Sequence, residues 1–145
     1  MICEARGLPL VVWTTPTNVP DSTATPEGLL ELEVQADHVP TLREQLGGPR
    51  VLLGDRGYGF PWLIDLVRSL GWVSLLSRRG SDQPHGSGLG VVRYVVERTL
   101  SWFNHFRRLR QCNERWGEHF QAFHDLAAML ICHRRLVKQR AEKRL

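Results

Sequence analysis

The alternation that decides the fold is clearest in residues 50–76, which read RVLLGDRGYGFPWLIDLVRSLGWVSLL. The apolar run before Asp55 predicts a buried strand, and the glycine-rich segment after it predicts a turn. Pro61 suits the first turn of a helix, and Gly71 suits its end. Residues 72–76 predict a second short strand. Two strands joined by a helix indicate a parallel pair, whose ligands bind beyond the carboxyl ends of the strands, where Asp55 stands.

The flanking segments extend this pattern to an α/β fold. Turn-forming residues are concentrated at 16–26, which we expect to be a loop, and at 78–90, which we expect to be a linker. Pro40 is expected to interrupt the first helix or to start its second part. The other expected elements, in chain order, are a strand end at 1–4, a strand at 8–15, a helix within 27–46, a helix at about 91–109 and a last helix at about 118–135.

Length and composition exclude several classes of protein. The chain has 145 residues, the size of one domain, and its 42% hydrophobic and 23% charged residues argue against wholesale disorder. Three cysteines do not make the even, dense set of a disulfide-stabilised secreted domain. The sequence shows neither a membrane span of roughly 20 apolar residues nor the pattern of a signal peptide. We therefore expect a cytoplasmic protein.

The net charge of +4 hides a split between the two parts of the chain. Residues 1–89 carry 7 basic and 10 acidic side chains, whereas residues 90–145 carry 12 basic and 5 acidic ones. A basic half of this kind is typical of a protein that contacts nucleic-acid phosphates. It is also typical of a solvated helical surface, which is the simpler interpretation, so the charge alone leaves both open.

Two acidic residues stand apart from the others. Asp55 follows an apolar strand, and Glu97 lies on a largely apolar and aromatic helix, where a carboxylate needs a partner. In the structural interpretation, Glu97 pairs with Arg93 one turn earlier and Asp55 caps the next turn. In the functional interpretation, the two carboxylates bind Mg²⁺, which prefers oxygen ligands and assists phosphodiester cleavage.

Several motifs of the chain occur in the same order in bacterial insertion-sequence transposases. They are GLPLVV (7–12), NVPDS (18–22), LLGDRGY (52–58), HGSGLG (85–90), RYVVERTLSWFNHFRRL (93–109) and LICHRRL (130–136). The combination of DRGY after a strand with ERT on a helix is specific, because both its form and its order fit. The chain therefore resembles, over nearly its whole length, the C-terminal part of a DDE transposase with a ribonuclease H-like core.

The resemblance implies an incomplete ribonuclease H-like fold of the α/β class. A mixed sheet with flanking helices would be followed by a C-terminal helical pair. Residues 1–145 would then form a single partial catalytic domain. Its parts would be a sheet-and-helix region at 1–77, a linker at 78–90, and a region at 91–145 that holds the glutamate-bearing helix and a basic C-terminal helix.

The same resemblance assigns site residues. Asp55 matches the second Asp of the catalytic triad and Glu97 its Glu, so both would ligate Mg²⁺, with Mn²⁺ as a substitute. Arg93 matches the family Arg one turn before that Glu, and Asn104 stands where many relatives carry a Lys. Both would contact DNA or support the acidic site. The other residues to which this role is assigned are Arg98, Arg107 and Arg108.

The chain departs from the family pattern in ways that bear on activity. The first catalytic Asp has no counterpart, since Asp21 belongs to a loop motif and Glu4 to a turn. Pro20 replaces the His of that loop motif, and Gly59 replaces the usual Asp after Gly-Tyr. The family's N-terminal DNA-binding region is missing as well. A Mg²⁺ site that loses one carboxylate is weakened, so we expect a truncated transposase that is inactive by itself.

The complete enzyme of this family would hydrolyse a phosphodiester at the end of its element and then use the freed 3′-hydroxyl to attack target DNA. The alternative is a non-catalytic remnant that binds DNA or interferes with an intact transposase subunit. The expected partners are therefore DNA and either a second copy or an intact transposase subunit, with no membrane. The expected location is the bacterial cytoplasm, in association with the nucleoid.

Two other groups of residues are interpreted structurally. His119 and His124 are five residues apart, which does not suit a zinc pair on one helical face, so neither is expected to be a ligand. Trp102, Phe103 and Phe106 form an aromatic stripe at helical spacing. We expect this stripe to pack in the core rather than to stack on bases.

Overall fold

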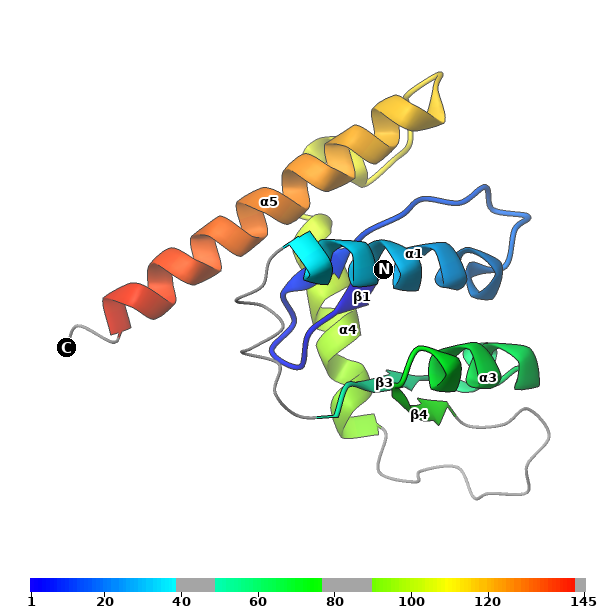
Figure 1. The fold of residues 1–145 in the computed structure, drawn as a ribbon. Helices are drawn as coiled ribbons and strands as arrows, with labels where there is room; N and C mark the ends of the chain where they lie inside the picture. Colours follow the sequence, from blue (N-terminus) through cyan, green and yellow to red (C-terminus); the bar gives the residue numbers. More distant parts are fainter. Residues whose placement is uncertain (39–48, 77–89, 143–145) are drawn as a thin grey trace. The chain divides into compact units, whose positions relative to one another are not determined.

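The chain folds into helices and short strands, which confirms the α/β class (Figure 1). The computed structural model describes residues 1–38, 49–76 and 90–142, while the side chains of residues 38 and 90–93 are outside the description. The interruption expected at Pro40 lies outside the described residues, as does the expected linker apart from its last residue.

The described chain is divided into two compact units. The central unit comprises Thr17–Arg93, and the discontinuous unit joins Met1–Pro16 to Tyr94–Leu145. The first unit is thus inserted in the sequence of the second. Asp55 belongs to the central unit and Glu97 to the discontinuous unit.

The central unit contains the strand–helix–strand motif that the sequence predicts. Strand β3 (Val51–Gly54) is followed by helix α3 (Pro61–Ser69) and strand β4 (Val73–Leu76). The two strands pair in parallel along their full length, as expected for a helical crossover. The carboxyl end of β3 therefore points toward the segment that holds Asp55.

Local signals set the boundaries of α3. Pro61 occupies the first turn, where its missing N–H needs no acceptor. Gly71 lies just beyond the helix with φ +77°, a conformation that favours glycine. Between them, Leu63, Ile64 and Val67 form the buried face of the helix. Burial of this apolar face holds the crossover together.

Helix α1 (Asp21–His38) corrects the prediction of a loop at 16–26, because its first turn begins inside that segment. Pro26 lies within the helix although it cannot donate a backbone hydrogen bond. The face that the helix buries runs at helical spacing from its first turn to its last. Its members are Ser22, Thr25, Leu29, Leu32 and Ala36. Tertiary burial therefore outweighs the local preference for a turn.

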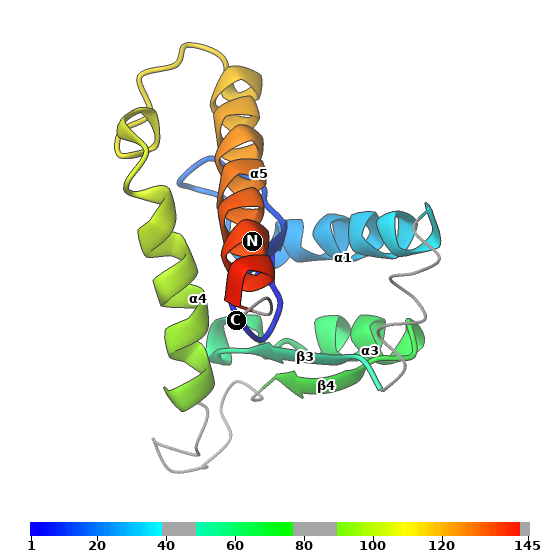
Figure 2. The ribbon, with the colours of Figure 1, turned by 90° about the vertical axis from the view of Figure 1, so that its left-hand side faces the viewer.

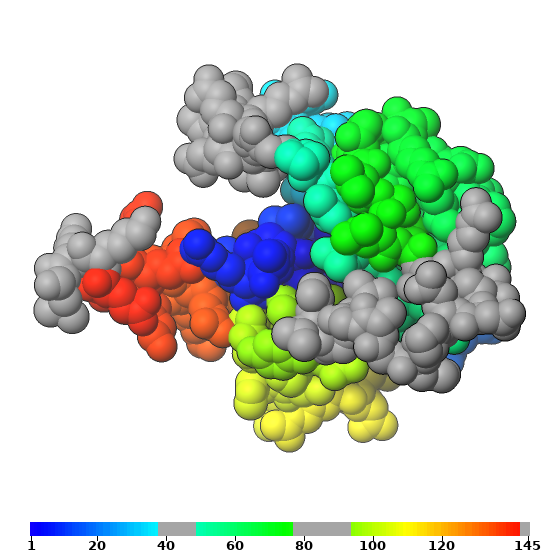
Figure 3. All heavy atoms as spheres, turned by 90° about the horizontal axis from the view of Figure 1, so that it is seen from below, coloured from blue at the N-terminus to red at the C-terminus, as the bar shows by residue number. Residues whose placement is uncertain are grey.

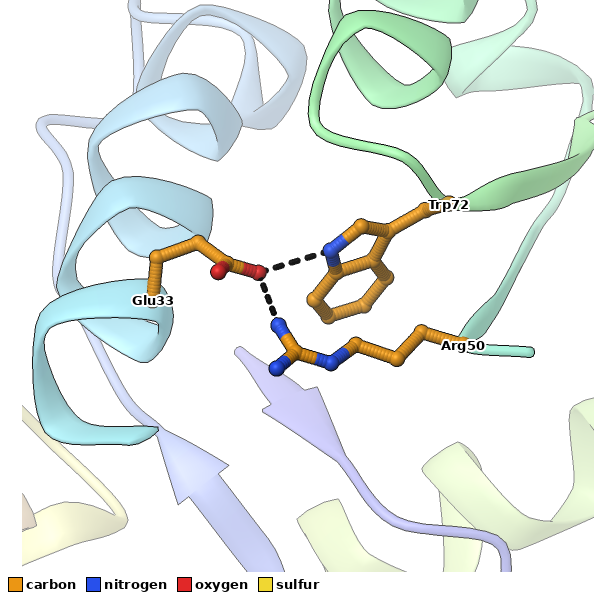
Figure 4. Close-up of polar contacts among 3 residues, drawn as sticks. All are labelled: Glu33, Arg50 and Trp72. Atoms are coloured by element: carbon orange, nitrogen blue, oxygen red, sulfur yellow. Dashed lines mark hydrogen bonds and ion pairs between the residues drawn. The ribbon is translucent and has the colours of Figure 1, made fainter. Parts of the chain in front are cut away.

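A polar cluster ties α1 to the segments that precede β3 and β4. Glu33 on α1 accepts hydrogen bonds through Oε1 from the indole Nε1 of Trp72, at 2.7 Å, and from Nη1 of Arg50 (Figure 4). The guanidinium of Arg50 also lies over the Trp72 ring, 5.5 Å from its centroid. One carboxylate thus fixes the amino-terminal ends of both strands against the helix.

The discontinuous unit begins with a short antiparallel pair, β1 (Ile2–Cys3) and β2 (Pro9–Val11). The strand expected at 8–15 is shorter than predicted, and the strand end expected at 1–4 is confirmed. Gly7 in the connecting turn has φ +92°. The turn therefore requires glycine at this position.

Two helices complete the discontinuous unit and confirm the expected helical pair. Helix α4 (Gly90–Phe103) is followed by the 3₁₀ turn η2 (Arg107–Leu109) and helix α5 (Gly117–Glu142). Figure 2 shows α4 and α5 as neighbouring helices, and in Figure 3 the blue N-terminal residues lie beside the atoms of both. Phe103, Ala127 and Ile131 form the buried centre of the unit.

Both helices differ in length from the prediction. Helix α4 ends at Phe103 rather than near 109, and the side chain of Arg110 donates a hydrogen bond to the carbonyl of Asn104 just beyond the helix end. The expected aromatic stripe is confirmed as core, because Trp102 and Phe106 pack against the buried cluster. Helix α5 continues past residue 135 to Glu142.

The single mixed sheet that the resemblance implied is not present in the described residues. These residues form two separate two-stranded sheets instead, β1–β2 antiparallel and β3–β4 parallel. The physical reason is that each strand pair belongs to a different compact unit and neither has a further strand beside it among the described residues. In the described part of the chain, every helix is too short or too polar to cross a membrane.

Candidate functional site

Asp55 stands at the carboxyl end of β3, as the sequence predicts. Its Oδ1 accepts a hydrogen bond of 2.8 Å from the backbone N–H of Gly57 and so caps the 3₁₀ turn η1 (Arg56–Tyr58). Capping is therefore a confirmed role of this carboxylate. It leaves the functional interpretation open, because a carboxylate that caps a turn has a second oxygen.

The turn around Asp55 leaves little freedom to its carboxylate. A Cβ on Gly57 would lie 2.9 Å from Oδ1, so a larger residue there would displace the acidic side chain. The backbone N–H of Tyr58 donates to the carbonyl of Asp55 at 3.1 Å. Glycine at position 57 thus allows the carboxylate of Asp55 to keep its capping position.

The pKa of Tyr58 indicates that a second acidic residue lies near this turn. Burial raises the pKa of its phenol, and the negative charges of Asp21 and Asp55 raise it further. Asp21 in the first turn of α1 is therefore close enough to act on the phenol. Asp21 was expected to lie in a loop and to have no role in the site. It lies near this turn because α1 begins at this residue.

Glu97 lies on the exposed surface of α4, in the discontinuous unit. The residue after next, Thr99, is fully buried and donates a hydrogen bond of 2.8 Å to the carbonyl of Gly7. The helix that carries Glu97 is thus fastened to the turn between β1 and β2. The side chain of Arg93, which the sequence pairs with Glu97, is outside the described residues.

Arg98 has a different environment from the one expected of a residue that only contacts DNA. Its Nη2 donates to the carbonyl of Arg6 at 2.8 Å, and its Nη1 donates to the phenol of Tyr94. Its guanidinium lies over the rings of Tyr94 and Trp102, at 4.8 Å and 5.4 Å from their centroids. Arg98 therefore helps to hold the β1–β2 turn on α4, and its DNA contact stays a prediction.

The other predicted basic and polar residues lie beyond the end of α4. Asn104 and Arg107 are exposed. Arg108 forms an ion pair with Glu114 at 2.9 Å and lies over the ring of Phe123, 4.9 Å from its centroid. Arg107, Arg108 and Glu114 line the same shallow surface hollow, with Asn113 beside them. Arg107, Arg108 and Asn113 are exposed to solvent.

The predicted site residues are divided between the two compact units. Asp55 lies in the central unit, whereas Glu97 and the basic residues that follow it lie in the discontinuous unit. Within residues 1–38, 49–76 and 90–142, no three His, Cys, Asp or Glu side chains lie together in a way that would hold a metal ion. A shared site for Asp55 and Glu97 therefore stays a prediction.

His119 and His124, neither of which is expected to bind zinc, lie in different environments. His124 stacks on Phe103 with ring centroids 5.8 Å apart, and its Nδ1 lies 3.0 Å from the carbonyl of Phe120. His119 is exposed. The packing of His124 among aromatic rings supports its structural interpretation.

Three further basic residues, Arg6, Arg135 and Lys138, have no individual role in the sequence-based prediction, which names only a basic C-terminal helix. All three line a second hollow in the discontinuous unit together with Arg98. The residues are far apart in the sequence, so no local motif marks them. Only the spacing of Arg135 and Lys138 on one face of a helix was available as a signal.

Comparison with known proteins gives one informative relative. A protein of Burkholderia cepacia named "Putative transposase for insertion sequence element IS402" is 39% identical to this chain over 136 residues. The match covers 91% of the chain and 60% of the relative, so the chain spans less than two thirds of that protein's length. No family model matches the chain, and no solved structure matches it significantly. The resemblance inferred from the motifs is confirmed at this level: the chain is related to the transposases of bacterial insertion-sequence elements.

Proposed function

We propose that the chain acts in DNA transposition as part of a DDE transposase with a ribonuclease H-like core. The observation that carries the proposal is the 39% identity to the IS402 relative over 91% of the chain. The position of Asp55 supports it, since ligands of parallel strands bind beyond their carboxyl ends. The substrates would be the ends of the element and the target DNA, which places the protein at the bacterial nucleoid.

In this proposal Asp55 and Glu97 provide carboxylate oxygens for Mg²⁺, or for Mn²⁺ in its place. The two residues fit the ion in chemical type, because hard divalent cations prefer oxygen ligands. A bound divalent ion supplies positive charge that stabilises the attacking and leaving oxygens during phosphodiester cleavage. The 3₁₀ turn η1 orients Asp55, and α4 orients Glu97.

The basic and polar residues of the discontinuous unit are proposed to hold the DNA backbone near this site. Phosphate contacts of this kind position a protein on DNA without reading its sequence. The residues proposed for this role, or for support of the acidic site, are Arg93, Arg98, Asn104, Arg107 and Arg108.

We further propose that the chain does not cleave DNA by itself. The resemblance assigns two of the three catalytic carboxylates to this chain, Asp55 and Glu97, and a Mg²⁺ site that lacks one carboxylate ligand is weakened. Purified chain with Mg²⁺ or Mn²⁺ is therefore expected to leave supercoiled plasmid intact. Metal-dependent nicking that Asp55→Asn and Glu97→Gln both abolish would show a complete site and contradict this inactivity.

The shared metal site has its own test, which does not depend on cleavage. In ¹⁵N-labelled chain, Mn²⁺ is expected to broaden the amide signals around Gly57 and Glu97 at the same concentration of the ion. Asp55→Asn and Glu97→Gln should each remove both effects. Asp65→Asn is the matched control, because Asp65 is an exposed acid on α3 in a weak pair with Arg68.

Two results would overturn the shared site. One is broadening around Gly57 that persists in Glu97→Gln, which would show that the two carboxylates bind the ion separately. The other is an equal loss in Asp65→Asn, which would show that Mn²⁺ responds to the general negative charge.

The second candidate is a non-catalytic remnant that binds DNA or an intact transposase subunit. The observation that favours it is the positive charge of residues 90–145, which include 12 basic and 5 acidic residues. This candidate predicts salt-sensitive DNA binding that is the same with Mg²⁺ and with a chelator. Binding that requires Mg²⁺ and both carboxylates would favour the first candidate.

A further inference from the structure

The second hollow of the discontinuous unit is lined by side chains from three separate segments. Arg6 comes from the β1–β2 turn, Arg98 from α4, and Arg135, Lys138 and Glu142 from α5. The three charged residues of α5 lie at spacings of three and four, so they occupy one face of that helix. The hollow measures about 340 Å³ and is open to solvent.

The charges in this hollow are strongly unbalanced. Among the described residues that line it, four are cationic and one, Glu142, is acidic, and Glu142 lies 3.9 Å from Lys138 in an exposed pair. Among the described residues, Arg6, Arg98 and Arg135 form no ion pair with a carboxylate. Because four positive charges lie beside one negative charge, the electrostatic potential of the hollow is strongly positive. The exposed pair of Lys138 and Glu142 is weak.

Two of these cations are held in place by packing. Arg135 lies over the ring of Trp102, 4.1 Å from its centroid, and Arg98 lies over the same ring at 5.4 Å. Arg98 is fixed further by its hydrogen bond to the carbonyl of Arg6. One indole thus keeps two guanidinium groups close together before any anion binds, which lowers the entropy cost of binding one.

We infer that this hollow binds the phosphate backbone of duplex DNA. Guanidinium groups present several N–H donors in a fixed plane and match phosphate oxygens well. The cations are spread over a turn and two helices rather than gathered in an enclosed cage, which suits an extended polyanion better than a single ion. The inference rests on the proposed function in its choice of DNA, while the charge and packing of the hollow stand independently.

The test is equilibrium binding of a fluorescent 20-base-pair duplex, followed by anisotropy with a chelator present so that metal binding has no effect. Arg135→Gln and Lys138→Gln are compared with Arg134→Gln and Arg140→Gln. The control pair removes the same charges from the same helix at exposed positions that do not line the hollow. Each hollow variant is expected to weaken binding about threefold to tenfold, and each control less than about twofold.

The dependence on salt gives a second measurement. Loss of one phosphate contact is expected to lower the slope of log K against log salt by about 0.9 in Lys138→Gln. Arg135→Lys separates charge from geometry, since it keeps the charge but loses the planar group over Trp102. The affinity of Arg135→Lys for the duplex should lie between those of wild type and Arg135→Gln. Lys138 is largely exposed, so its variant tests the hollow even if Arg135→Gln is unstable.

Each other outcome overturns a defined part of the inference. Equal weakening in the hollow and control variants would show that diffuse charge binds DNA and that the hollow has no special role. If the hollow variants bind the duplex as tightly as wild type does, the hollow is not the DNA-binding site, and the proposed function is unaffected. Wild type that binds no DNA either with the chelator or with Mg²⁺ would overturn both, whereas wild type that binds only with Mg²⁺ would overturn the hollow and leave the proposed function intact. Displacement of the duplex by inorganic phosphate at constant ionic strength would assign the hollow to the free ion.

Discussion

Replacing Gly7 with alanine should destabilise the discontinuous unit strongly. Gly7 has φ +92°, and its carbonyl accepts the hydrogen bond of the buried Thr99 hydroxyl at 2.8 Å. A Cβ at this position would lie 2.7 Å from Oγ1 of Thr99 and 3.2 Å from Nη2 of Arg98. The substitution therefore adds backbone strain and also pushes the turn away from α4.

The expected magnitude follows from these two effects. Alanine with a positive φ costs about 1–2 kcal/mol, and overpacking of a buried contact costs about 1–3 kcal/mol. We expect Gly7→Ala to lower the free energy of unfolding by about 3 kcal/mol. Gly71→Ala is the matched control, since Gly71 has φ +77° but no atom within 4 Å of its Cβ position. Gly71→Ala should lower the free energy of unfolding only by the cost of backbone strain, about 1–2 kcal/mol.

Urea denaturation followed by far-UV circular dichroism measures both losses. The double variant Gly7→Ala/Thr99→Ala supplies a further comparison, because it removes the atom that the new methyl group meets first. In a double-mutant cycle the two substitutions should be coupled by about 1 kcal/mol or more, in the direction of relief. The reasoning is refuted if Gly7→Ala costs no more than Gly71→Ala, or if the cycle shows no coupling.

Glu33→Ala leaves an indole and a guanidinium without their acceptor, so it should lower the free energy of unfolding in urea by about 1–3 kcal/mol. The exposed Glu31→Ala should cost less than about 0.5 kcal/mol, and equal losses would contradict the role of the cluster. Burial raises the pKa of the Cys3 thiol, so iodoacetamide at pH 8 should alkylate the exposed Cys112 several-fold faster, as measured by peptide mass spectrometry. Equal rates would argue against burial of Cys3. The pKa of Tyr58 is raised on folding, so its contribution to stability is complete below about pH 10 and is lost as pH rises through the folded value. Above pH 10, wild type should therefore lose stability relative to Tyr58→Phe, and parallel pH curves would contradict this.

The strand–helix–strand motif was predictable because its signals are local. Pro61 and Gly71 mark the two ends of α3 by their own backbone preferences, whatever the rest of the chain does. Asp55 was predictable for the same reason, since an acid after an apolar strand and before a glycine-rich turn caps that turn. Features of this kind depend on residues only a few positions apart.

The start of α1 was not predictable from local signals. Residues 16–26 are rich in Thr and Pro, which indicate a loop, but the buried face of the helix begins with Ser22 and Thr25. A polar residue at the start of such a face looks like a surface residue until its neighbours are known. Asp21 was set aside for the same reason, because its proximity to Tyr58 depends on that helix.

The basic hollow could not be predicted because it depends on tertiary packing. Arg6 and Lys138 come from opposite parts of the sequence, and the indole of Trp102 that holds Arg98 and Arg135 was interpreted only as core. Net charge showed that the second half of the chain is basic. It did not show which cations lack a carboxylate beside them.

The insertion of one unit within the other sets an order for folding during synthesis. The hairpin of Met1–Pro16 is completed by contacts such as that between Gly7 and Thr99, which are 92 residues apart. At about 5–20 residues per second, the ribosome needs about 4–15 s to add residues 17–93 before α4 can be made. Throughout that interval the hairpin lacks its partner helices, whereas the parallel strand pair of the central unit is complete once Leu76 has been added. Until α4 and α5 are made, Pro9 and Val11, which are buried in the folded unit, have no helix to cover them. Apolar surface that is exposed during synthesis in this way favours aggregation of the unfinished chain.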